Sequence, residues 1–176
     1  AALDGERVAL LDRDPGRLTR LIAELSVDPS RVAAFAVDLA DAVAVERTVA
    51  EVVARFGRID ALFNIAGAYR GGQRVDETPD ADWALLLDAN FRSTLHVSRA
   101  VVAAMRRLGG GAIVNVGSRA SLAGDAGAAA YSVAGLVAPA SASFESADIE
   151  IAQEMARAFG LEPRLGAHAR DRHGYL

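Results

Sequence analysis

Short apolar runs alternate along the chain with longer segments in which apolar residues recur every three or four positions. The runs end at polar or small residues and predict buried strands. These strands cover Glu6–Leu11, Val32–Val37, Ile59–Ile65 and Ala112–Val116. Because the runs are nearly continuous, we expect the strands to be covered on both faces, as in a parallel sheet.

The intervening segments carry the spacing and the start signals of amphipathic helices. Asp14-Pro15 and Asp41 suit helix starts, and Gly57 suits a helix end. Pro79 opens a long helical region over Asp80–Leu108, which we expect to bend near Asp88–Asn90. The alternation of strand and helix predicts an α/β fold with a doubly wound parallel sheet and helices on both faces.

Polar residues follow the first two strands. Asp12 could accept hydrogen bonds from the ribose hydroxyls of a dinucleotide, and a carboxylate there repels a 2′-phosphate. Arg13 could instead pair with that phosphate, so the pattern favours NAD but leaves NADP open. Asp38 could accept from an adenine amino group. Taken alone, Asp12 is better explained as a strand-end or helix-capping residue, and Asp38 as a turn residue.

The third strand leads into Asn64, Ala66 and Gly67, a tight exit where a ligand could approach the backbone. A plain turn explains these residues equally well. Asn90 is unusual inside a helix, because asparagine prefers caps and turns. It marks a helix bend or holds a water molecule.

Ser118 ends the fourth strand, and Tyr131 lies thirteen positions later at the start of another predicted helix. At the carboxyl edge of a parallel sheet the two side chains could form a proton-transfer pair, with the serine binding a substrate carbonyl. A tyrosine needs nearby positive charge to act near neutral pH. The competing interpretation is a loop serine and a half-buried core tyrosine.

Composition narrows these interpretations. The 176 residues are 52% hydrophobic and 24% charged, with a net charge of −4 and no cysteine. This indicates a globular chain without disulfides or thiolate metal sites, and the scattered arginines indicate neither a nucleic-acid nor a membrane partner. We expect a cytoplasmic protein. His168 and His173 are weak evidence for a metal site, so none is predicted.

The polar and small residues at the ends of the strands follow one another in an order that supports a family resemblance. The chain resembles the classical short-chain dehydrogenase/reductases, most closely the 3-oxoacyl-carrier-protein-reductase-like branch. The resemblance covers Glu6 to Ala134 and rests on VALLDRDPGRL, VAAFAVDLAD, GRIDALFNIAGAY, DWALLLDANFRSTLHVSRAVVAAM and GGGAIVNVGSRASLAGDAGAAAYSVA.

The resemblance implies a Rossmann-like fold and hydride transfer between a nicotinamide cofactor and a small-molecule carbonyl or alcohol. It gives Tyr131 the role of general acid/base, Ser118 that of orienting the carbonyl, and Asn90 that of supporting a proton-relay water. It assigns cofactor contacts to Asp12, Asp38, Asn64, Ala66 and Gly67. It also allows a homo-oligomer formed through the long helix.

Three departures from the family pattern are visible. The first strand and its glycine-rich turn are absent, as are the C-terminal strands after Tyr131, so we expect a truncated sheet. The lysine expected one helical turn after Tyr131 is replaced by Gly135, and all 19 basic residues of the chain are arginine. A deletion after Ala134 would explain both the lost lysine and the position of Pro139.

We therefore expect residues 1–160 to form an incomplete Rossmann-like domain and residues 161–176 to form a polar tail, with a further helix over Ala147–Phe159. Two functions remain open. The chain is either an NAD(P)-dependent oxidoreductase or an inactive remnant or interaction module. The lost phosphate turn predicts negligible binding of NAD or NADP by this chain.

Overall fold

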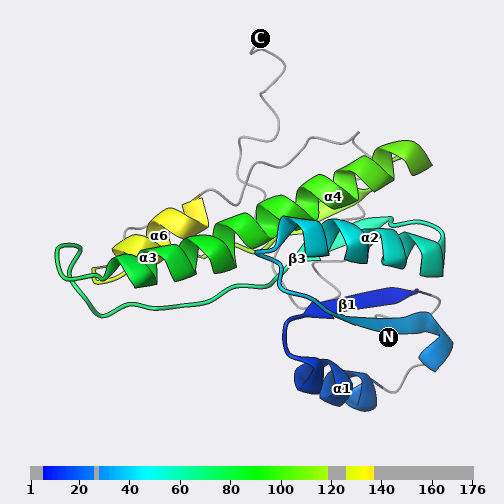
Figure 1. The fold of residues 1–176 in the computed structure, drawn as a ribbon, viewed down its shortest axis with the longest axis horizontal. Helices are drawn as coiled ribbons and strands as arrows, with labels where there is room; N and C mark the ends of the chain where they lie inside the picture. The colour runs from blue at the N-terminus through cyan, green and yellow to red at the C-terminus, as the bar shows by residue number, and fades with distance from the viewer. Residues whose placement is uncertain (1–5, 26–27, 119–125, 137–176) are drawn as a thin grey trace, which may run out of the picture.

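The computed structural model describes residues 6–25, 28–118 and 126–136 (Figure 1). The predicted alternation of strands and helices is confirmed there. The order is β1 (Val8–Asp12), α1 (Pro15–Glu24), η1 (Pro29–Arg31), β2 (Val32–Ala36), α2 (Ala42–Phe56), β3 (Ala61–Asn64), α3 (Asp80–Leu86), η2 (Leu87–Arg92), α4 (Ser93–Leu108), β4 (Ala112–Asn115) and α6 (Ala129–Leu136).

Local sequence signals set several helix ends. Asp14 caps α1 by accepting the backbone N–H groups of Gly16 and Arg17, and Asp41 caps α2 in the same way. Gly57 ends α2 with a φ of 84°, a conformation that favours glycine. At η1, the backbone N–H of Ser30 donates to Asp28 and lowers the pKa of that carboxyl.

The bend expected near Asp88–Asn90 is a π-helical segment, η2. The widened turn is accompanied by side chains that bond to its own carbonyls. Asn90 donates to Leu86 O at 3.0 Å, and Ser93 donates to Ala89 O at 2.6 Å. Such segments are rare in helices and often lie at functional sites.

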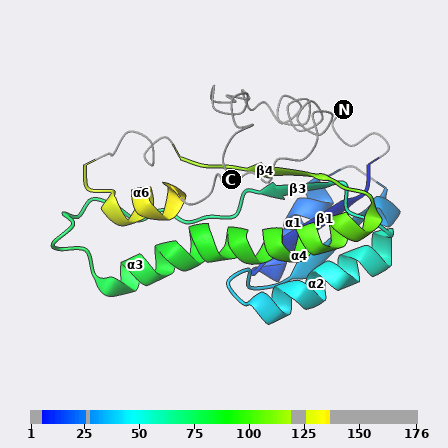
Figure 2. The ribbon, with the colours of Figure 1, turned by 90° about the horizontal axis from the view of Figure 1, so that it is seen from above.

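The sheet differs from the single doubly wound sheet that we expected. Within the described residues the strands form two separate parallel pairs, β1–β2 and β3–β4. Helix packing joins the two halves of the fold, because α2 and α4 lie side by side (Figures 1 and 2). Parallel strands do meet at common carboxyl edges, as predicted.

The main core lies between α2, α4 and the strands. Its buried residues are Val37, Val45, Val49, Val97, Val101, Ala104 and Met105. On the other side of the β1–β2 pair, α1 packs against both strands (Figure 1). None of the described helices combines the length and the apolar character needed to cross a membrane.

The expected burial of the strands on both faces is wrong for most positions. Among the strand residues only Val32 and Ala112 are fully buried. The physical reason is that a pair of strands leaves edges uncovered, whereas a wide sheet shields its central strands on both sides. Two apolar residues of the predicted strands follow the observed ends of β3 and β4 and are exposed: Ile65 is 62% exposed and Val116 is 44% exposed.

The predicted Ala147–Phe159 helix, Pro139 and the 161–176 tail lie outside the described residues.

Candidate functional site

Asn90 holds the chain segment that leaves β3. Its side-chain oxygen accepts the backbone N–H of Ala68 at 2.9 Å, and its amide nitrogen donates to Ala68 O at 3.0 Å. The side chain therefore satisfies both backbone groups of one loop residue as well as Leu86 O of its own helix. The helix departs from α-helical geometry at Asn90, where we predicted a bend, and the role of Asn90 with a water molecule stays a prediction.

Gly67 lies directly against this clamp. A Cβ atom at Gly67 would lie 2.7 Å from Asn90 Oδ1, closer than real Cβ contacts allow. Gly67 and its neighbour Ala66 are both exposed. The backbone of Ala66 and Gly67 is therefore exposed, and Asn90 holds it in place through Ala68. A ligand contact at these residues stays a prediction.

Asn64 ties three elements together. Its amide nitrogen donates to Asn115 Oδ1 at 2.8 Å and to Ser98 Oγ at 3.0 Å. Asn64 and Asn115 are register partners on β3 and β4. Sequence reasoning missed Asn115 and Ser98, although a polar residue ending an apolar strand was a usable signal for Asn115.

Tyr131 lies in α6, as expected, and is half-buried. Its ring meets that of Tyr69 edge to face, with centroids 4.9 Å apart and planes at 86°. Such a pair contributes beyond simple apolar burial. Tyr69 is 66% exposed and follows the segment held by Asn90, so the structure brings Tyr131, Tyr69 and the exit of β3 together.

Leu86 sits beneath this group. It is 1% exposed and clusters with Ala130 and Ala134 of α6, with Tyr131 and Ala68 packed around them. The small alanines let α6 approach α3 and η2 closely. One buried leucine thus supports both the Asn90 clamp and the tyrosine.

Ser118 is half-buried and follows β4, at the same carboxyl edge as the exit of β3. The segment 119–125 that leads from it toward Tyr131 lies outside the described residues. The proton-transfer pair of Ser118 and Tyr131 stays a prediction.

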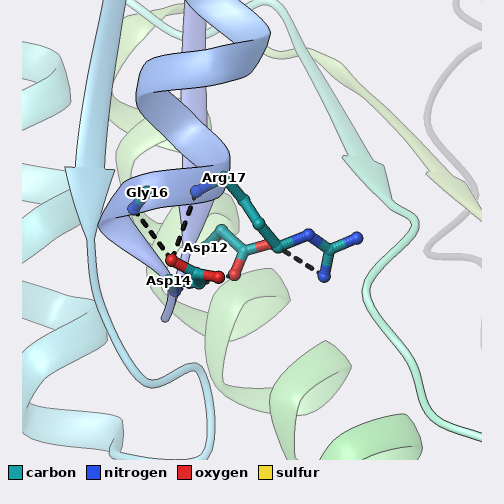
Figure 3. A network of polar contacts seen from close by, with 4 residues as sticks. All are labelled: Asp12, Asp14, Gly16 and Arg17. Atoms are coloured by element: carbon teal, nitrogen blue, oxygen red, sulfur yellow. Dashed lines mark hydrogen bonds and ion pairs between the residues drawn. The ribbon is translucent and has the colours of Figure 1, made fainter.

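Asp12 ends β1 and makes local contacts (Figure 3). Its Oδ1 accepts the backbone N–H of Asp14 at 2.9 Å, and its Oδ2 lies 3.7 Å from a guanidinium nitrogen of Arg17. Arg17 therefore lies beside Asp12. The sequence analysis considered only Arg13, which directly follows Asp12 in the chain. The helical turn that begins at Asp14 brings Arg17 back over the strand end.

Asp38 is exposed beyond β2, and its Oδ1 accepts the backbone N–H of Ala40 at 2.9 Å. This is the turn interpretation given for Asp38 from sequence. This bond uses only one of the two carboxylate oxygens of Asp38. A cofactor contact through Asp38 stays a prediction.

A cavity of about 260 Å³ lies between the loop after β3 and the start of α6. Arg70 and Asp82 form an ion pair in its wall, with N–O distance 2.5 Å. Its other lining residues are Gly71, Gly72, Gln73, Thr78, Leu86, Gly127, Ala128, Ala129 and Ala130. No cluster of metal-ligating side chains occurs within the part of the chain that the structure describes.

Known proteins match both the sequence and the fold. The chain is 38% identical to D-threitol dehydrogenase of Mycolicibacterium smegmatis over 120 residues, which cover 68% of this chain and 46% of the relative. The structure of NAD⁺-bound xylitol dehydrogenase matches with a TM-score of 0.68 and 35% identity, covering 74% of this chain and 50% of that one. Serine dehydrogenase complexed with NADP⁺ matches with a TM-score of 0.70 and 27% identity, covering 77% and 53%.

The chain thus spans about half the length of the relatives that it matches. The family model for short chain dehydrogenase matches residues 1–138, most of the chain. The chain belongs to the short-chain dehydrogenase family.

Proposed function

We propose that this chain carries the substrate side of an NAD(P)-dependent oxidoreductase site, which transfers hydride between a nicotinamide cofactor and a carbonyl or alcohol. The observation that carries the proposal is the grouping of Tyr131, Asn90 and the exit of β3 around Leu86. In this arrangement Tyr131 exchanges the proton of the substrate oxygen and Ser118 binds that oxygen. The nicotinamide cofactor, when bound, supplies or accepts the hydride.

The strand ends fit such a cofactor. Asp12 has an Oδ2 whose described contact is a partly solvated arginine at 3.7 Å, so it can accept from ribose hydroxyls. Asp38 is exposed where an adenine would lie, and Gly67 offers open backbone beside the clamp. Relatives bind NAD⁺ or NADP⁺. We propose NAD as the preferred cofactor because of the Asp12 carboxylate.

A small-molecule substrate is part of this proposal. The proposed likeness to 3-oxoacyl-carrier-protein reductases rests on the sequence motifs alone. The matched relatives include proteins named for other substrates, a polyol and a steroid. The pocket around Arg70 and Asp82 is lined by both polar and small apolar residues, without a pattern that favours one of these classes.

A second candidate function is a non-catalytic module of dehydrogenase ancestry. The observation that favours it is Gly135, which stands one helical turn after Tyr131 where the family pattern has a lysine. No lysine elsewhere in the 176 residues can replace it.

Calorimetric titration of the folded chain with NAD and NADP separates the two functions. Micromolar affinity for either cofactor supports the oxidoreductase. No heat of binding by a chain that circular dichroism shows to be folded supports the module. Substituting Tyr131→Phe then tests the mechanism, since it should abolish turnover and leave cofactor affinity nearly unchanged.

A further inference from the structure

Tyr69 is an aromatic residue that the proposed proton transfer does not use. It lies in the loop of residues 65–79 between β3 and α3, which the structure describes throughout and which contains neither helix nor strand. Tyr69 is 66% exposed, so burial of apolar surface explains little of its position. Its ring nevertheless meets the ring of Tyr131 edge to face, with the centroids 4.9 Å apart.

The backbone on both sides of Tyr69 is held in place. Before it, the side chain of Asn90 bonds to the N–H and the carbonyl oxygen of Ala68, at 2.9 and 3.0 Å. After it, Arg70 forms an ion pair with Asp82 of α3 at 2.5 Å. Together these contacts set where Tyr69 lies relative to α3 and η2.

A contact between glycines ties the same loop to the start of α6. The backbone N–H of Gly72 donates to Gly127 O at 2.8 Å. Gly127 has a φ of 75°, a conformation that favours glycine, and a Cβ atom there would lie 3.4 Å from the Cα of Gly72. Tyr131 follows in the first turn of α6. The loop that carries Tyr69 is therefore joined to the helix that carries Tyr131 by a backbone hydrogen bond.

Gly71 leaves room for the ring of Tyr69. A Cβ atom at position 71 would lie 2.5 Å from the Tyr69 hydroxyl, closer than real Cβ contacts allow, and 3.0 Å from Gly127 O. The ring of Tyr69 thus turns back over its own loop, and its hydroxyl end lies at Gly71. Any side chain at position 71 would displace this ring.

The contact with Tyr69 restricts the ring of Tyr131. Tyr131 also packs against the cluster of Leu86, Ala130 and Ala134, but the two alanines are small and restrict the ring less than larger side chains would. An edge-to-face pair contributes about 0.5–1.5 kcal/mol beyond the burial of its area. That energy favours the one Tyr131 rotamer in which the two rings meet at right angles.

We infer that Tyr69 is a positioning residue, which holds the ring of Tyr131 in one orientation and thereby keeps its hydroxyl on the substrate side. The effect on turnover rests on the proposed oxidoreductase function, whereas the orientation of Tyr131 does not. Proton transfer requires the hydroxyl to lie within hydrogen-bond reach of the substrate oxygen. A displacement of about 1 Å at such a site can cost roughly a hundredfold in rate.

The orientation of Tyr131 can be measured in the full chain, whether or not that chain is active. Three-bond NMR couplings across the Cα–Cβ bond of Tyr131 report the populations of its χ1 rotamers. The natural chain and Tyr69→Phe, which keeps the ring, should show one rotamer. Tyr69→Leu should populate a second rotamer while circular dichroism shows the chain still folded, because the substitution is at an exposed position.

Two further variants sharpen this measurement. Gly71→Ala should populate the second rotamer of Tyr131 as well, because its Cβ displaces the ring of Tyr69. Val75→Ala is the matched control, since Val75 lies in the same loop and is 63% exposed. It should leave the couplings of Tyr131 unchanged.

Turnover provides the second measurement. Tyr69→Leu should lower kcat and kcat/KM together by about tenfold, and Tyr69→Phe should restore both. A single Tyr131 rotamer in Tyr69→Leu, or an unchanged kcat for that variant of an active chain, would overturn the inference. Couplings that change as expected in a chain without turnover would support the positioning by Tyr69 and contradict the oxidoreductase function.

Discussion

The side-chain oxygen of Asn90 lies only 2.7 Å from the position that the Cβ of any residue other than glycine would take at position 67. Asn90 cannot retreat without breaking its bonds to both backbone groups of Ala68. We therefore expect Gly67→Ala to lower the free energy of unfolding by about 1–3 kcal/mol, the usual cost of overpacking. Denaturant unfolding measures this change.

Gly117 provides the matched control for this variant. It also follows a strand, but a Cβ there meets no atom of the described residues within 4 Å, so Gly117→Ala should change stability by less than about 0.5 kcal/mol. Asn90→Ala should cost roughly 1–3 kcal/mol because it leaves partly buried backbone groups unpaired. If the Gly67 and Asn90 effects add fully in the double variant, the clash is not with the amide.

A second prediction concerns Leu86, which is 1% exposed between α3 and α6. Leu86→Ala should cost about 2–5 kcal/mol through lost burial and a cavity. Its local effect should be to loosen α6 and the nearby Tyr131. Fluorescence of Trp83, the single tryptophan of the chain, reports this directly because its ring packs against the same cluster.

The partly exposed Val133 on the same helix serves as the comparison. Val133→Ala removes methyl groups that are partly in solvent, so it should change the Trp83 emission and the unfolding midpoint much less than Leu86→Ala does. Equal shifts for the two variants would show that α6 is held by its own helical propensity and not by Leu86.

Local signals in the sequence were sufficient to predict the helices and strands, but not to predict which strands pair in the sheet. Asp14, Asp41 and Gly57 act on neighbouring backbone, so the helix ends near them could be predicted. Asn90 signalled the bend because its amide competes with the helical hydrogen bonds. Strand pairing depends on contacts far apart in the sequence, and apolar runs could not show that β1 and β3 lack a direct ladder in the described residues.

In the candidate site, too, sequence spacing predicted where residues lie on strands and helices but not which of them are in contact. The sequence pattern predicted that Asn64 lies at the end of the third strand and Tyr131 near the start of a helix, and both are found in the structure. The Tyr69–Tyr131 contact and the approach of Arg17 to Asp12 depend on how a loop and a helical turn fold back, which one-dimensional spacing does not encode. Ser98 was invisible for the same reason, since it reaches Asn64 from a distant helix.

Arg17 gives a third prediction, on cofactor choice. Its guanidinium lies beside Asp12 and can contact a 2′-phosphate, which the Asp12 carboxylate alone would repel. Arg17→Ala should weaken NADP binding about tenfold, or roughly 1.4 kcal/mol, with little effect on NAD. Arg13→Ala is the matched control, and an equal loss in both variants would point to general charge and not to a specific contact. Titrations at two salt concentrations distinguish these cases.

The last prediction addresses the position after Tyr131. Gly135→Lys would place an ammonium group one helical turn from the phenol, on the same face of α6. A cation there favours the phenolate, so proton transfer by Tyr131 should become easier and turnover should rise roughly tenfold or more. NADPH oxidation with a simple ketone or aldehyde, followed by absorbance, measures this, provided that the chain binds the cofactor.

Replacing a glycine inside a helix by alanine or lysine also stabilises the helix by about 0.5–1 kcal/mol, with or without a charge. Gly135→Ala separates this effect from that of the charge, because it restores helix propensity without a cation. Only Gly135→Lys should raise turnover, and adding Tyr131→Phe should remove the gain. If Gly135→Ala and Gly135→Lys raise turnover equally, the stability of α6 limits turnover. The missing cation beside Tyr131 is then not the cause of low activity.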